Sequence, residues 1–132
     1  MNEEPRKIIT KTMTVIKNYK EVFDFFENVK NWETGGALRS ISKGNDGWWS
    51  FQTPSGNAKV KIHSNREFGI LDHDFIGGGI TWNVHARIVP NGKGSTISWT
   101  FICPENMSEE EFEEQLKNFD MEIINWKKAL GS

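Results

Sequence analysis

The strongest hydrophobic pattern in the chain lies near its end, in residues 108–130. Ser108 followed by Glu111 forms a capping box, which is typical of a helix start. Apolar side chains then recur at alternating spacings of four and three, which places them on one stripe of an α-helix: Phe112, Leu116, Phe119, Ile123, Trp126 and Leu130. We therefore predict a helix about 33 Å long whose apolar stripe requires a large apolar partner.

The first part of the chain combines one strand pattern with two short helical patterns. Residues 7–16 are rich in β-branched side chains, which predicts a first strand. Asn18 and Glu21 stand at capping-box spacing before a short helical stripe. A second brief helix is predicted over residues 32–37, where the pair Gly35 and Gly36 weakens it and is a candidate hinge.

From residue 38 onward, alternating side chains and turn residues predict six consecutive antiparallel strands. The alternation is clearest where Ala58, Val60 and Ile62 oppose polar neighbours, so that one side faces a core and the other faces water. The run of glycines at 77–79 is read as a turn between two strands. The predicted strands are 38–43, 48–53, 57–64, 68–76, 80–89 and 96–103. With the first strand they make an α+β fold with a seven-stranded antiparallel sheet.

Composition narrows the class of protein. A chain of 132 residues with 36% apolar side chains is expected to form one domain, residues 1–132. Six Trp and nine Phe suggest that large rings line a concave surface, although most single rings in proteins simply fill the core. The net charge of −2 gives no positive field for a nucleic acid, so we expect no nucleic-acid partner.

The cysteine count and the hydropathy bear on location. Cys103 is alone, which excludes a disulfide framework and favours a reducing, cytoplasmic setting. No apolar run approaches the ~20 residues of a membrane span, so no integral membrane association is expected.

His73 is the leading candidate for chemistry. It lies between Leu71 and Phe75 on the apolar face of its strand, whereas Asp72 and Asp74 point the other way. An inward imidazole can orient a ligand or act as a general base. The alternative is a core histidine that is satisfied by a backbone carbonyl or water.

Metal and cofactor sites are not indicated. His63 and His85 fall on the polar faces of their strands, opposite to His73, and Cys103 has no neighbour at metal-ligand spacing. We therefore assign no metal, no cofactor and no nucleophile. Arg87 and Asp72 also fall on outer faces, which leaves His73 as the candidate acid or base.

Four local phrases resemble the START-like helix-grip superfamily, also called SRPBCC. They are GWWSFQTPSG from Gly47, EFGILDHDF from Glu67, RIVPNGKGS from Arg87 and PENMSEEEF from Pro104. They are similar to the bacterial polyketide cyclase or dehydrase-like branch. The resemblance implies a strongly curved sheet wrapped around the C-terminal helix, with a cavity between them whose mouth lies near the two short helices. Glycines at 69 and 77–79 are candidate points of bending.

This reading predicts which side chains surround the cavity. Strand positions follow from alternation and helix positions from the middle of the stripe, whereas Trp32 is placed by analogy with the family's cavity mouth. Trp48 leaves the register of the strand around Trp49 and Phe51 open. The predicted ligand-binding residues are Trp32, Trp49, Phe51, His73, Phe75, Trp82, Trp99, Phe119 and Ile123.

Three functions follow from this interpretation. The first is binding, transport or sequestration of a small hydrophobic molecule such as a lipid, an isoprenoid or an aromatic or polyketide-like compound, without required catalysis. The second is a polyketide cyclase, aromatase or dehydratase that uses His73 as acid or base. The third is a protein-interaction module of the chaperone-assisting type, with Ile9, Trp48 and Ile102 as a candidate apolar patch on a monomer or weak homodimer.

Overall fold

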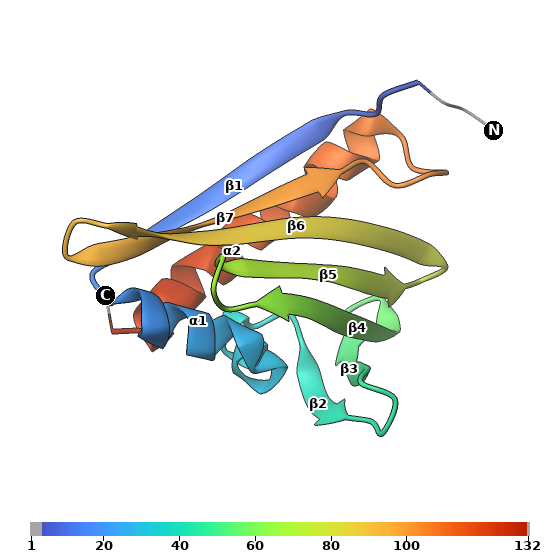
Figure 1. The fold of residues 1–132 in the computed structure, drawn as a ribbon. Helices are drawn as coiled ribbons and strands as arrows, with labels where there is room; N and C mark the ends of the chain where they lie inside the picture. Colours follow the sequence, from blue (N-terminus) through green and yellow to red (C-terminus); the bar gives the residue numbers. More distant parts are fainter. Residues whose placement is uncertain (1–3, 132) are drawn as a thin grey trace.

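The computed structural model describes residues 4–131. Seven strands form one antiparallel sheet in the order β1-β7-β6-β5-β4-β3-β2 (Figure 1). The first strand therefore pairs with the last, and the others follow in chain order. The strands are β1 (Ile8–Val15), β2 (Arg39–Lys43), β3 (Trp49–Thr53), β4 (Gly56–Asn65), β5 (Ile70–Gly77), β6 (Ile80–Asn91) and β7 (Gly94–Ile102).

The long helix α2 (Glu109–Ala129) lies across one face of this curved sheet (Figure 1). Its start is capped as predicted, because the Ser108 hydroxyl accepts a hydrogen bond of 3.1 Å from the Glu111 N–H. Phe112, Leu116 and Trp126 from the apolar stripe are buried. The α+β fold class with a seven-stranded sheet around the C-terminal helix is confirmed.

The two short helices cover the sheet near the C-terminal end of α2. Helix α1 (Tyr19–Glu27) starts at the predicted cap, where the Asn18 side chain accepts from the Glu21 N–H at 2.9 Å. The second helix, η1 (Val29–Gly35), is a 3₁₀ helix that begins earlier than the predicted 32–37. Asn28 explains the earlier start, because its side chain accepts from the Lys30 N–H. Gly36, at φ 93°, ends the helix.

Three strand boundaries differ from the prediction by two residues: the start of β5, the end of β6 at Asn91 and the start of β7 at Gly94. The strand assigned to 68–76 begins at Ile70, and the Phe68 side chain is 66% exposed. Gly69 has a φ of 67°, which belongs to a turn and ends the preceding extended segment. The glycine turn at 77–79 is confirmed, since Gly77 pairs with Ile80 around Gly78 and Gly79, both at positive φ.

Candidate ligand-binding cavity

A cavity of about 700 Å³ lies between the sheet and α2. The strands contribute one face through side chains that alternate inward, and α2 contributes the opposite wall. Eight aromatic rings contribute to the lining: Phe26, Trp32, Phe75, Trp82, Trp99, Phe101, Phe119 and Trp126. Such a volume and lining are typical of small-molecule sites.

Trp99 organises one end of the cavity. Its ring centroid lies 5.6 Å from that of Phe26, 5.0 Å from that of Phe119 and 5.6 Å from that of Trp126. The contacts with Phe26 and Phe119 are edge-to-face, which is the favourable arrangement for aromatic quadrupoles. This packing holds the rings in place around the open volume.

The cavity opens between two hairpin turns and the first half of α2. The exposed lining residues are Pro54, Ser55, Gly78, Glu111, Gln115 and Asn118. The expectation of a mouth near the two short helices is wrong, because η1 is packed against α2. There the Trp126 indole N–H donates to the Trp32 carbonyl at 3.2 Å, and the Asn125 amide donates to the Gly35 carbonyl at 2.8 Å.

His73 is buried on β5 and lines the cavity. Its Nδ1 lies 3.1 Å from the Leu71 carbonyl oxygen, which only accepts, so Nδ1 carries the proton and Nε2 is an acceptor. Its ring contacts Trp32 edge-on at 5.0 Å between centroids. Burial lowers the His73 pKa to about 4, which keeps the imidazole neutral at physiological pH.

The neighbouring carboxylates point to the outer face of the sheet, as alternation predicts. Asp72 accepts from the Ala86 N–H at 3.0 Å and pairs with His85 and Arg87. Burial raises the Asp72 pKa, but hydrogen bonds from Arg87 and His85 outweigh that effect and lower it. Asp74 also points outward, and its carboxylate pairs with the His63 Nε2 at 3.0 Å. These groups belong to a surface network outside the cavity.

Glu122 on α2 is a cavity residue that sequence reasoning missed. Its half-buried carboxyl group lines the aromatic end, and a Cβ added at Gly35 would lie 3.2 Å from its Oε2. It makes no hydrogen bond or ion pair with any of residues 4–131. Burial without a partner raises the Glu122 pKa to about 7.

The sequence contains a pattern that identifies Glu122 as a residue facing the cavity. Polar residues at spacings of four, three and four form a second stripe on α2, offset by one position from the apolar stripe, and all four line the cavity: Glu111, Gln115, Asn118 and Glu122. Glu111, Gln115 and Asn118 are exposed at the opening, whereas Glu122 is half-buried. Glu122 would have been predicted if the polar residues next to the apolar stripe had been included among the candidate cavity residues.

The predicted cavity residues divide into two groups. Trp32, His73, Phe75, Trp82, Trp99 and Phe119 line the cavity together, whereas Trp49, Phe51 and Ile123 do not. Phe51 is buried, and its ring centroid lies 5.4 Å from that of Phe75. Trp49 is half-buried beside Lys43, whose ammonium lies 5.6 Å from its ring. Ile123 is half-buried against the core.

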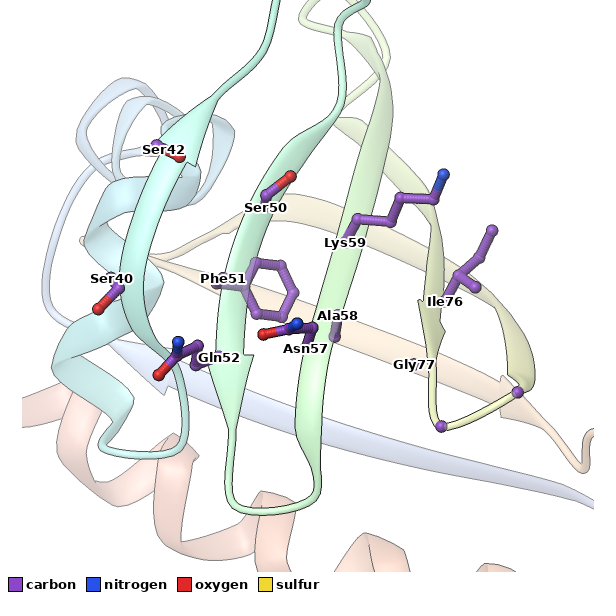
Figure 2. Close-up of a pocket in the computed structure, with 12 residues that line it drawn as sticks. Ser40, Ser42, Ser50, Phe51, Gln52, Asn57, Ala58, Lys59, Ile76 and Gly77 are labelled. Carbon is purple, nitrogen blue, oxygen red and sulfur yellow. The ribbon is translucent and has the colours of Figure 1, made fainter.

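A second hollow, of about 590 Å³, lies over β2, β3, β4 and the end of β5 (Figure 2). Much of its lining comes from the exposed alternation positions of these strands, including Ser50, Gln52 and Asn57. Lys59 is its one ionisable lining residue, and the Lys59 ammonium lies 4.7 Å from the Trp48 ring. Phe51 is the one aromatic side chain among the described residues that line the hollow, and these residues include no His, Asp or Glu.

The remaining candidate residues are accounted for by packing. Cys103 is buried, and its sulfur lies 3.5 Å from the Met107 carbonyl oxygen. Within residues 4–131 no group of three or more His, Cys, Asp or Glu is placed to hold a metal ion. The proposed apolar patch is not strongly exposed, since Ile9, Trp48 and Ile102 are all half-buried.

No helix in the described part of the chain combines the length and apolar character needed to cross a membrane.

Comparison with known proteins identifies the fold. No family model and no curated protein matches the chain. Among solved structures, an uncharacterised protein from Bacillus thuringiensis matches with a TM-score of 0.73 at 11% identity, covering 96% of this chain and 100% of that one. The protein XoxI from Bacillus cereus matches with a TM-score of 0.73 at 12% identity, covering 93% of this chain and 94% of that one. Ara h 8.0201 matches with a TM-score of 0.70 at 14% identity, covering 94% of this chain and 97% of that one. The chain therefore has the helix-grip fold, in which a curved antiparallel sheet holds a long C-terminal helix.

Proposed function

We propose that this protein binds a small hydrophobic molecule in the cavity between the sheet and α2. The observation that carries the proposal is the cavity itself, about 700 Å³ in volume, lined by eight aromatic rings together with aliphatic side chains and open to solvent at one side. We also infer membership of the polyketide cyclase or dehydrase-like branch of the START-like superfamily, which the four sequence phrases and the helix-grip fold support.

The energetics favour a ligand with a large apolar body. Burying apolar surface contributes about 25 cal/mol per Å², and part of this is offset by the loss of ligand freedom on binding. His73 and Glu122 add two polar contact points inside the cavity, apart from the exposed polar residues at its opening. Orientation of the ligand would come from these two groups.

Native mass spectrometry of the purified protein, followed by organic extraction, tests this function. We expect a defined apolar compound to co-purify with the protein or, for an empty protein, saturable binding of a fluorescent apolar probe.

Val84→Phe, which fills the cavity from β6, should weaken binding at least about tenfold. Ile88→Val is the control, because Ile88 is buried on the same strand outside the cavity. Failure of the wild-type protein to bind any apolar probe contradicts the proposal.

Proton-transfer catalysis is the second candidate, because His73 and Glu122 both face the cavity. A carboxyl group that titrates near neutrality is suited to act as acid or base on a carbonyl compound. The test is deuterium exchange next to the carbonyl of an aromatic ketone such as tetralone. Catalysed exchange that is lost in Glu122→Gln would support an enzyme, and exchange at the rate of buffer would exclude this activity on that ketone.

A further inference from the structure

The charged groups of the cavity are all acids, and this limits the chemistry of its ligand. Glu122 lies at the aromatic end and Glu111 at the opening, while no Lys or Arg of the described residues lines the cavity. The third titratable lining group, His73, is neutral and presents the acceptor Nε2. A ligand that enters therefore meets negative charge and no positive charge.

Glu122 has no hydrogen-bond or ion-pair partner among residues 4–131, and three lysines that reach α2 pair with other acids of that helix. Lys11 pairs with Asp120 at 2.8 Å, Lys7 pairs with Glu113, and Lys117 pairs with Glu114. A carboxylate that is half-buried among rings without a counter-charge is costly, because little solvent or protein polarity compensates it. A positive charge on the ligand would supply the missing partner.

Aromatic rings add a second attraction for a cation. Trp32, Trp99 and Trp126 line the same end of the cavity as Glu122. The face of an indole ring carries partial negative charge and attracts ammonium groups within about 6 Å of its centre. A carboxylate among indole rings is a combination that suits an amine with a large apolar body.

Gly35 on η1 packs closely against the side chains of Glu122 and Trp126. A Cβ at this position would lie 3.2 Å from Glu122 Oε2 and 2.7 Å from Trp126 Nε1. A side chain at residue 35 would therefore displace both groups. Glycine on η1 keeps the carboxyl group free of a covering side chain from that helix.

We propose that the cavity binds a lipophilic organic cation, an amine joined to an aromatic or aliphatic body, whose ammonium group pairs with the Glu122 carboxylate. The inference rests on the proposed binding function and specifies its ligand class. A neutral apolar ligand would cover the carboxyl group without compensating its charge, and an anionic ligand would be repelled by it.

Three matched indole compounds test the charge preference by isothermal titration calorimetry: tryptamine, tryptophol and indolepropionate. Dodecylamine, dodecanol and dodecanoate, used below their micelle concentrations, repeat the comparison with an aliphatic body. We expect each amine to bind at least about tenfold tighter than its alcohol, with the carboxylate weakest. Glu122→Gln should remove the preference for the amine, and Glu110→Gln, an exposed acid of the same helix outside the cavity, should retain it.

Proton exchange on binding gives an independent readout. At about pH 7, titrations in buffers of different ionisation enthalpy should show proton release for the amine and proton uptake for the alcohol, because only the amine stabilises the ionised Glu122. The other titratable lining groups, His73 and Glu111, stay unchanged in Glu122→Gln, where both proton signals should vanish. Equal binding of alcohol and amine, or a preference that survives Glu122→Gln, overturns the cation assignment and leaves the binding function standing. Failure of all six compounds to bind overturns both.

Discussion

Glu122 and His73 are expected to make opposite contributions to the pH dependence of stability. Burial raises the Glu122 pKa from 4.5 to about 7, so the folded state binds more protons than the unfolded state between these values. The free energy of unfolding therefore falls as pH rises through this interval. Burial lowers the His73 pKa from 6.5 to about 4, so the unfolded state binds more protons there and stability rises with pH.

The contributions of Glu122 and His73 to the free energy of unfolding are similar in magnitude. One pH unit corresponds to about 1.36 kcal/mol, so the interval from 4.5 to about 7 amounts to at most roughly 3 kcal/mol of lost stability from Glu122. The interval from 6.5 to about 4 gives roughly 3 kcal/mol from His73 in the opposite direction. The two effects nearly cancel, so Glu122 and His73 together should contribute almost no net change in stability between pH 4 and pH 8.

Single variants separate the two effects. Glu122→Gln keeps the shape and removes the charge, so the variant should match wild type near pH 4.5 and exceed its stability by up to roughly 3 kcal/mol at about pH 8. His73→Asn keeps an amide near the Leu71 carbonyl and cannot become an imidazolium. Its stability relative to wild type should be higher at about pH 4 than at pH 8 by roughly 3 kcal/mol.

Urea unfolding followed by tryptophan fluorescence at a series of pH values measures these differences, and NMR titration of the Glu122 carboxyl carbon checks the pKa directly. The double variant Glu122→Gln/His73→Asn should show no pH dependence of stability from these two groups. A Glu122→Gln difference that does not change with pH refutes the reasoning, because it would mean that the carboxyl group ionises equally in the folded and unfolded chains.

Three further substitutions probe the surrounding structure by urea unfolding. Asp72→Asn should cost about 1–3 kcal/mol because it weakens the contacts to Arg87 and the sheet backbone, and an unchanged midpoint would contradict that role. Gly35→Ala should cost about 1–3 kcal/mol through the clash with Trp126, and a neutral result would mean that η1 moves away without penalty. Ser108→Ala should cost about 1 kcal/mol by removing the cap of α2, and a smaller loss than that of an exposed serine such as Ser64→Ala would argue against the cap.

The fold could be predicted because its elements are encoded by local periodicity. Alternation placed Ala58 and Val60 inward on β4, and spacings of three and four placed Phe112 and Leu116 on the buried stripe of α2. Where a backbone conformation overrides side-chain character, prediction was wrong. Phe68 has strand propensity, but the positive φ of Gly69 places it in a turn.

The candidate site was less predictable because periodicity gives the face of a side chain and not its position along the face. Phe51 is buried as alternation requires and its ring contacts Phe75, yet only Phe75 lines the cavity, whereas Phe51 lines the second hollow. On α2, one residue is a rotation of about 100°, which separates Glu122 in the lining from Ile123 outside it. The relative positions of helix and sheet, which only the folded structure contains, decide such cases.

The unpaired state of Glu122 links the fold to the proposed ligand. A helix that stands off from a curved sheet leaves a cavity, and a polar residue at the edge of the apolar stripe then faces that cavity without a protein partner. The carboxyl group of Glu122 does not stabilise the fold, since a glutamine of the same shape would avoid a cost of up to roughly 3 kcal/mol at about pH 8. Groups that lower stability in this way are characteristic of binding and catalytic sites, where the cost is offset when the intended partner arrives. For Glu122 the partner that offsets this cost best is a positive charge, which residues 4–131 do not supply, and so we expect the ligand to carry it.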